Sequence, residues 1–287
     1  MPMKTDALPV TVITSRGLSS FAEWRELWAA RDLARFIVQR DLKTRYVQSV
    51  LGLGWAIVQP LFTTGVMTLI FGRLAGISSD GVPYPVWSLT AVVAWTFFQN
   101  ATSDVGNCLA ANIGVITKVY FPRLVLPLAA VACRVFDLLI MLSLLFITLV
   151  ILHGQLLAAG CHIQADALWA VPAALAITGL AALALGLWLA GLSVQYRDVR
   201  VAQGLLLQLL MYASPVIYSA NRIPAAWRGI YFLNPLAGAI ETLRNCLFGT
   251  APVPVAHLAM GAAVSLLGLI GGLWCFRRAE NIMVDVA

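Results

Sequence analysis

Cationic, acidic and aromatic side chains crowd together just before the first strongly apolar stretch of the sequence. The segment reads Arg40-Asp41-Leu42-Lys43-Thr44-Arg45-Tyr46 and leads through Leu51-Gly52-Leu53-Gly54-Trp55 into Gln59-Pro60-Leu61. Guanidinium, ammonium and carboxylate groups offer ion pairing and hydrogen bonding to another surface. The pattern therefore indicates a protein that meets something at the cytoplasmic face of a membrane.

A second dense segment, Lys118-Val119-Tyr120-Phe121-Pro122-Arg123, lies within residues 104–129. It places two cations around two aromatic rings and a proline. Residues 104–129 are too polar to be buried in lipid and too apolar for a free linker. We expect a short helix on the cytoplasmic surface, with an ordinary interfacial turn as the alternative.

The composition identifies the elements that must position these segments. Apolar residues make up 60% of the 287 residues and charged residues only 11%, with a mean hydropathy of +0.85. Soluble domains carry about a quarter charged residues, so this is an integral membrane protein. Six stretches are long and apolar enough to cross a bilayer as helices. They lie near residues 51–74, 85–103, 130–152, 168–192, 199–219 and 256–276.

The expected fold is therefore an all-α membrane protein with six transmembrane helices. The fifth span is the weakest of the six, because Gln203, Gln208 and Pro215 interrupt it; five spans are the alternative. Residues 1–50 form a cytoplasmic leader and an amphipathic helix, and residues 51–287 form the transmembrane domain. Residues 104–129 are its cytoplasmic coupling segment.

The distribution of positive charge predicts the orientation. With six spans, fourteen of the 19 lysines and arginines fall on one side and four on the other. Positive residues in short loops tend to stay cytoplasmic, so both termini are predicted to be cytoplasmic. This asymmetry accounts for most of the net charge of +6, and no nucleic-acid partner is needed to explain it.

An amphipathic helix is predicted before the first span. Ser20 and Glu23 have the spacing of a capping box, and Phe21, Trp24 and Trp28 follow at helical intervals. Indole rings favour the headgroup region of a bilayer, so this helix is expected to lie in the inner interface. A simple membrane anchor is the alternative.

Arg134 and Asp137 are three residues apart in the third span and would share one helix face. Charges within spans are costly and invite a functional interpretation. Their position near the cytoplasmic edge favours a self-neutralising pair that positions the helix.

The outer segment 220–255 is half-polar. Asn234-Pro235 has the form of a helix N-cap followed by a first-turn proline, and Glu241 and Arg244 lie on the helix that would follow. Short outer helices that dip back into the membrane are expected here, forming an outer gate between spans five and six.

Several sequence signatures are missing. The chain has no Walker A motif, no His-Glu-x-x-His helix and no Gly-x-Ser-x-Gly elbow. The span centres lack the carboxylates that ion-coupled transport commonly uses. The interpretation favoured is a non-enzymatic permease, without metal site or cofactor of its own, driven by a separate ATPase.

The sequence resembles type-2 ABC transporter permeases that export bacterial polysaccharides, above all lipopolysaccharide O-antigen. The resemblance rests on the segment around Arg40–Leu61, on Lys118–Arg123, on Tyr196-Arg197-Asp198 and on Asn234-Pro235, in that order. It implies a homodimer in the bacterial inner membrane, with two copies of an ATPase that binds ATP and Mg²⁺. A lipid-linked polysaccharide would pass through a channel at the dimer interface, surrounded by membrane lipids.

The resemblance also implies roles for the two dense segments, which would contact the ATPase. The residues concerned are Arg40, Asp41 and Lys43 in the first and Lys118, Tyr120, Phe121, Pro122 and Arg123 in the second. The first segment would carry ATPase movement into the first span through Gly52, Gly54 and Trp55.

Aromatic and amide side chains suit the lining of a sugar path, because ring faces pack against pyranose rings. Candidates are Trp95, Phe97, Phe98, Gln99 and Asn100 on span two, with Tyr212 and Tyr218 on span five. Interfacial belts and ordinary packing are the alternative for these residues. Other cargoes stay open as well: capsular polysaccharide, teichoic acid, or a drug or small lipid. A non-transporting scaffold is the alternative of another class.

Overall fold

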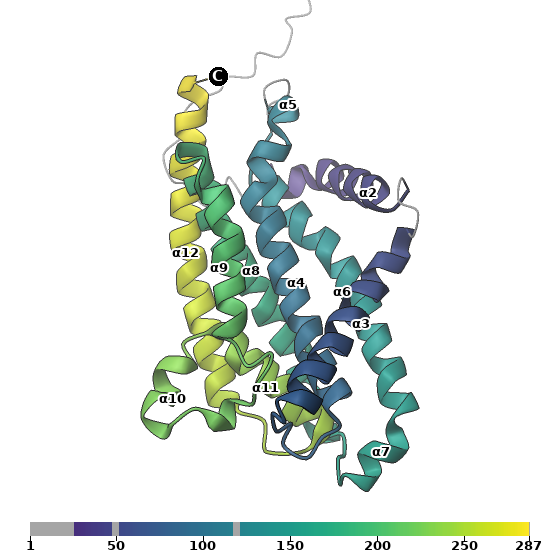
Figure 1. Ribbon diagram of the computed structural model, residues 1–287. Coiled ribbons are helices and arrows are strands. Elements are labelled where there is room, and N and C mark those ends of the chain that lie inside the picture. Colours follow the sequence, from purple (N-terminus) through teal and green to yellow (C-terminus); the bar gives the residue numbers. More distant parts are fainter. Residues whose placement is uncertain (1–25, 48–51, 117–120, 287) are drawn as a thin grey trace, which may run out of the picture.

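The computed structural model of the protein describes residues 26–47, 52–116 and 121–286. Within these ranges the chain consists of helices joined by turns and short connections, and contains no strand. The long helices run side by side as a bundle, with one helix lying across one end of it (Figure 1). The predicted all-α class is confirmed.

The crossing helix is α2, Arg31–Val47. Its apolar side packs on the bundle, where Ile37 is buried in one cluster with Phe121 and Phe276. Trp28, just before the helix, and Phe36 remain exposed. Ser20, Phe21 and Trp24 of the predicted amphipathic helix lie outside the described residues, so that helix stays a prediction; α2 begins after its last predicted aromatic residue, Trp28.

The first span comprises η1 (Gly52–Gly54), α3 (Trp55–Met67) and the π-helical turn η2 (Thr68–Leu74). Ala75 donates its backbone N–H to Ile70, five residues back, at 2.8 Å. Most of the apolar side chains of this span face outward. Only Pro60, Thr64 and Met67 of α3 are buried.

Helix α4, Tyr84–Ala111, lies at the centre of the bundle, and most of its residues are buried. It continues two turns beyond the predicted end near residue 103, so residues 104–111 belong to the span helix and not to a separate surface segment. A short helix, α5 (Ile113–Ile116), follows it.

Three further long helices complete the bundle: α6 (Val125–Ile151), α8 (Ala170–Gln195) and α12 (Val255–Val286). Helices α6 and α8 pack on α4, and α12 packs on α8. Small residues allow α8 to approach its neighbours closely. A methyl group added at Gly186 would lie 2.5 Å from the Cβ of Val105 in α4, and one at Gly272 would lie 2.8 Å from the carbonyl oxygen of Ala184. Between α6 and α8 lie α7 (His153–Ala158) and η3 (Ala165–Ala167).

The remaining helices are shorter: α9 (Val199–Tyr212), η4 (Ala220–Arg222), α10 (Ala225–Tyr231) and α11 (Pro235–Phe248). Helix α9 stops before Pro215, one of the residues that weakened the fifth predicted span. Gly249, at φ +66°, ends α11 in the left-handed conformation that suits glycine at this position.

In the part of the chain that the structure describes, four helical segments are long and apolar enough to cross a membrane: Gly52–Leu74, Val125–Ile151, Ala165–Gln195 and Val255–Glu280. They match four of the six predicted spans. Helix α4 does not meet the same measure of apolarity, and α9 is too short. Neighbouring helices cover α4, so its buried Ser88, Thr90 and Thr102 do not face lipid.

The two ends of the bundle differ. At one end, called the α2 end here, lie α2, α5 and the C-terminal part of α12 (Figure 1). At the other, the α10 end, lie α7, α10 and α11.

Candidate functional site

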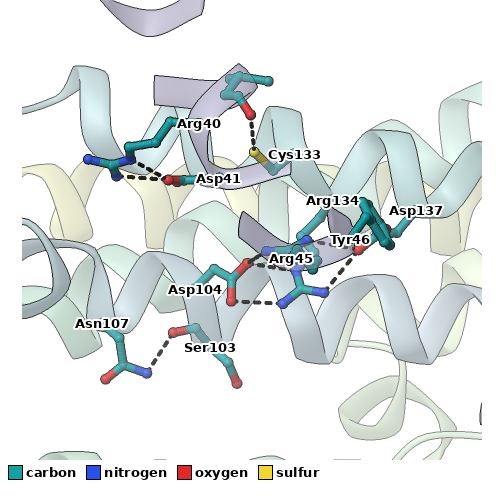
Figure 2. A network of polar contacts seen from close by, with 11 residues as sticks. Arg40, Asp41, Arg45, Tyr46, Ser103, Asp104, Asn107, Cys133, Arg134 and Asp137 are labelled. Carbon is teal, nitrogen blue, oxygen red and sulfur yellow. Dashed lines mark hydrogen bonds and ion pairs between the residues drawn. The ribbon is translucent and has the colours of Figure 1, made fainter. Parts of the chain in front are cut away.

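A cluster of charged side chains joins three helices at the α2 end. Arg45 and Tyr46 come from the last turn of α2, Asp104 from α4, and Arg134 and Asp137 from α6 (Figure 2). These five residues are called the polar cluster. They bring together segments that are up to 92 residues apart in the sequence.

The two arginines each contact both carboxylates. Arg45 donates from Nη2 to Asp104 at 2.8 Å and from Nη1 to Asp137 at 3.0 Å. Arg134 holds both oxygens of Asp104, from Nε at 2.6 Å and from Nη2 at 2.9 Å, and reaches Asp137 at 2.9 Å. Tyr46 donates its hydroxyl to the second oxygen of Asp137.

The formal charges of the polar cluster cancel, since two guanidinium groups face two carboxylates. Its side chains are largely shielded, from 9% exposed at Asp137 to 26% at Arg45. Burial, followed by the hydrogen bond to Asp137, raises the pKa of Tyr46 to about 12, so its hydroxyl keeps its proton. Removing one member of a shielded pair leaves a charge without compensation, which costs about 3–5 kcal/mol when burial is complete and less here.

The predicted pair of Arg134 and Asp137 is confirmed as an ion pair. The sequence analysis missed that Asp104 and Arg45 complete it. Asp104 is the only acidic residue of α4 and comes directly after the predicted second span, which could have marked it as a partner for Arg134.

The remaining charged residues of α2 are more accessible. Arg40 pairs with the adjacent Asp41 at 2.7 Å and donates to the side-chain oxygen of Asn112 at 2.6 Å. Asn112 is the residue that ends α4. Lys43 is exposed. Arg40 thus ties α2 to α4 while keeping about a third of its side chain accessible.

The second dense segment is only partly described, because Lys118 and Tyr120 lie outside the described residues. Phe121 is buried, in the same apolar cluster as Ile37 of α2. Pro122 is half-buried, and Arg123 bonds to the last turns of α12, at 2.9 Å from the backbone oxygen of Glu280 and 3.5 Å from its carboxylate. The segment therefore connects α2, α6 and α12.

A second charged site is buried near the α10 end. Arg244 of α11 is 2% exposed, and its guanidinium carbon lies 3.4 Å from the ring centroid of Trp87. It donates to the backbone oxygens of Trp87 and Val216 at 3.4 and 3.3 Å. Glu241 lies 3.6 Å from its Nη1 and also accepts from the backbone N–H of Ala220 at 3.1 Å. The pair therefore holds three segments together.

The start of α11 agrees with the sequence pattern. Asn234 caps the helix by accepting from the backbone N–H of Leu236 at 3.0 Å, and Pro235 is its first residue. The amide of Asn234 also donates to the Ser214 hydroxyl at 2.8 Å. The cap consequently fixes α11 against the end of α9.

These groups bind and position one another, and they do not form a metal site. Among the residues that the structure describes, no three or more His, Cys, Asp or Glu side chains are grouped as metal ligands.

A comparison with protein families identifies the architecture. The model of the ABC-2 type transporter family matches residues 33–248, from α2 to the end of α11. The chain belongs to the ABC-2 type transporter family. Both charged sites lie within the matched range.

The curated relatives of this ABC-2 chain are membrane permeases and transport proteins. An O-antigen export system permease protein RfbA of Klebsiella pneumoniae is 26% identical over 89% of this chain and 95% of its own length. The protein of the same name from Myxococcus xanthus is 29% identical, over 89% and 96%. The polysialic acid transport protein KpsM of Escherichia coli is 22% identical, over 85% and 92%.

The residues predicted to line a channel fall into three groups by exposure in this ABC-2 chain. Trp95, Phe97 and Phe98 are buried within the bundle, and Trp95 donates to Gln99 at 2.7 Å. Gln99 and Tyr212 are exposed. The half-buried residues Asn100 and Tyr218 complete the set, and Tyr218 donates to the backbone oxygen of Tyr212 at 3.0 Å. Their role in a channel stays a prediction.

Proposed function

We propose that this ABC-2 chain is the membrane-spanning subunit of an exporter that moves a lipid-linked polysaccharide, O-antigen in the first instance, across the bacterial inner membrane. The observation that carries the proposal is the match to O-antigen permeases along nearly the whole of both chains. The chain contributes no catalysis of its own, and ATP with Mg²⁺ would be bound and hydrolysed in a partner ATPase.

The proposed assembly is a homodimer with two ATPase subunits. In each protomer α4 and the segment from α9 to residue 219 would join the four apolar spans to give six. Helices α10 and α11 would be the short outer helices, entering the membrane without crossing it. The α2 end, with both termini, would face the cytoplasm, in agreement with the positive charge of the predicted inner loops.

The accessible charges of α2 suit the ATPase contact. Arg40, Asp41 and Lys43 offer cations and a carboxylate on a helix that lies across the α2 end (Figure 1). Lys118 and Tyr120 would extend this surface. Phe121, Pro122 and Arg123 would act behind it, since Phe121 is buried and Arg123 is bonded to α12.

The proposed sugar path uses the accessible members of the predicted lining, Gln99, Asn100, Tyr212 and Tyr218. The buried Trp95, Phe97 and Phe98 would form the wall behind them. At the α10 end, Asn234, Pro235, Glu241 and Arg244 would set the position of α11 as an outer gate. Arg244 would hold α11 in place, because its guanidinium is buried on the ring of Trp87 and bonds to the backbone oxygens of Trp87 and Val216.

Capsular polysaccharide is the second candidate cargo. It is favoured by the similarity to the polysialic acid transport protein. That similarity has a lower sequence identity than the match to the O-antigen permeases, but it covers nearly as much of the chain.

The test is a purification of the chain together with the ATPase that binds it, reconstituted in lipid vesicles. Lipid-linked O-antigen is expected to stimulate ATP hydrolysis and to become accessible on the far side of the vesicle. In cells, loss of the gene is expected to remove O-antigen from the surface.

Loss of capsule with intact O-antigen would replace the first cargo by the second. ATP hydrolysis that is indifferent to both polymers, with an unchanged cell surface, would reject export of polysaccharide altogether. A variant of the partner ATPase that binds but cannot hydrolyse ATP serves as the control for energy-dependent transfer.

A further inference from the structure

The polar cluster lies at the C-terminal end of α2, the helix that precedes the first span. Arg45 and Tyr46 are in the last turn of α2, and the first span begins a few residues later, at Gly52. A force applied to α2 can reach the bundle along the chain into α3, or sideways through the cluster. The contacts of the two routes are unequal.

The route through the cluster is anchored in two central helices. The single guanidinium of Arg45 bonds to Asp104 of α4 and Asp137 of α6 at once, at 2.8 and 3.0 Å. A guanidinium is a planar, rigid fork, so two simultaneous bonds fix its orientation as well as its distance. Tyr46 adds a third bond, to Asp137.

Arg40 adds one bond from α2 to Asn112 at the end of α4, at 2.6 Å, but reaches α4 through this single bond. The other contacts of α2 with the bundle are of a different kind. Ile37 packs in an apolar cluster with Phe121, and the thiol of Cys133 donates weakly to the backbone oxygen of Val38 at 3.6 Å. Apolar packing has no direction and permits small sliding movements. Charge-assisted hydrogen bonds are directional and short, so the cluster fixes the position of the end of α2.

The route along the chain is less constrained. In α3 only Pro60, Thr64 and Met67 are buried, while large side chains such as Phe62 are exposed. Helix α4, by contrast, is buried along most of its length and packs against α3, α6, α8 and α11. Movement delivered to Asp104 therefore reaches most of the protomer.

We propose that Arg45 is a positioning residue that couples α2 to α4 and α6, so that ATPase-driven movement of α2 enters the second and third spans directly. The inference rests on the proposed function, because it requires an ATPase acting on α2. It differs from transmission through Gly52, Gly54 and Trp55 into the first span alone. Arg45 need not touch the polysaccharide.

The deciding experiment separates the mechanical role from simple charge balance. Arg45→Gln leaves Arg134 facing two carboxylates, with an excess negative charge. The double variant Arg45→Gln with Asp104→Asn restores neutrality, since Arg134 and Asp137 remain as a balanced pair, but it does not restore the ionic tie of α2. Both variants are purified with the ATPase, and ATP hydrolysis and polysaccharide transfer are measured on the same vesicles.

The double variant is expected to remain in the membrane with its ATPase and to hydrolyse ATP within about twofold of the wild-type rate, while polysaccharide moved per ATP falls by about tenfold or more. Wild-type transfer in the double variant would overturn the inference, because neutrality would then be all that the cluster provides. A double variant that is lost from the membrane or from the ATPase would also overturn it, by showing a role in folding or docking.

The matched control is Asp32→Asn with Arg35→Gln. This pair also lies on α2 and also removes one charge of each sign, but its side chains are 78% and 74% exposed and bond to each other at 3.4 Å. Transfer per ATP in this control is expected to equal that of the wild type. If the wild-type vesicles themselves neither respond to polysaccharide nor move it, the proposed function fails, and that result is distinct from a failure of Arg45.

Discussion

The guanidinium carbon of Arg244 lies 3.4 Å from the ring centroid of Trp87, joining α11 to the N-terminal half of α4 inside the protein. The contact places a cation on the face of an indole ring, where the ring quadrupole attracts it. Glu241 balances the charge from the next turn of α11. The arrangement explains how a helix with two charged residues can be almost wholly buried.

Replacing Arg244 by lysine is therefore expected to destabilise the protein. An ammonium group is not planar and cannot both cover the indole and reach the backbone oxygens of Trp87 and Val216. We expect a loss of about 2–4 kcal/mol, because a buried charge is left with poor compensation. A drop of the unfolding midpoint in detergent, followed by intrinsic tryptophan fluorescence, measures it. Arg200→Lys, at an exposed residue of α9, is the control and should leave the midpoint unchanged; equal midpoints for both variants would contradict the stacking argument.

Gly186→Ala is expected to separate α8 from α4. The added methyl group would lie 2.5 Å from the Cβ of Val105, and both atoms are fixed to helix backbones. Overpacking of this kind costs about 1–3 kcal/mol. Thermal unfolding measures the loss. Gly204→Ala in α9 adds the same methyl group where nothing lies within 4 Å, so it should be neutral or slightly stabilising. A Gly186→Ala protein as stable as the wild type would show that the two helices can move apart without cost.

Substitutions of Asn234 are expected to separate its two bonds. Asn234→Ala removes both the cap of α11 and the bond to Ser214, at a cost of about 1–2 kcal/mol. Asn234→Asp keeps an oxygen for the backbone N–H of Leu236 but cannot donate to Ser214, so its loss should be smaller. Hydrogen exchange of the first-turn amides of α11 reports the cap. Equal exchange in the two variants would refute the assignment of separate roles.

Tyr46 gives a prediction for alkaline pH. Its pKa in the folded protein, about 12, lies above the ordinary value of 10.0, so the neutral phenol is favoured by folding. A group with a raised pKa contributes its full stabilisation below pH 10, and this is lost as the pH rises toward 12. The stability difference between the wild type and Tyr46→Phe should therefore shrink between pH 10 and 12, measured by chemical unfolding in detergent. A difference that stays constant over this interval would contradict the hydrogen bond to Asp137.

Local patterns in the sequence predicted local structure well. The cap at Asn234 and the pairing of Arg134 with Asp137 both depend on residues within one helical turn, and both are present in the structure. The positions of the four most apolar spans also followed directly, because lipid imposes a composition on any helix that faces it.

Features that depend on distant partners were not predicted. Nothing near Arg45 in the sequence points to Asp104, since the contact joins α2 to a helix 59 residues further on. The second span was expected to end near residue 103, because residues 104–129 were judged too polar to be buried in lipid. The paired arginines shield the carboxylate of Asp104, which allows the helix to continue to Ala111.

The low apolarity of α4 also bears on how the protein is made. A helix that is too polar to partition into lipid unaided needs neighbours to shelter it, yet α4 is synthesised before α6 and α8, which cover it. In the proposed six-span arrangement, stable entry of α4 into the bilayer would therefore wait for later parts of the chain, and membrane insertion of this protein would be a cooperative event. Destabilising substitutions in α8 would then act first on biogenesis: the nascent chain would be degraded before any complex has formed.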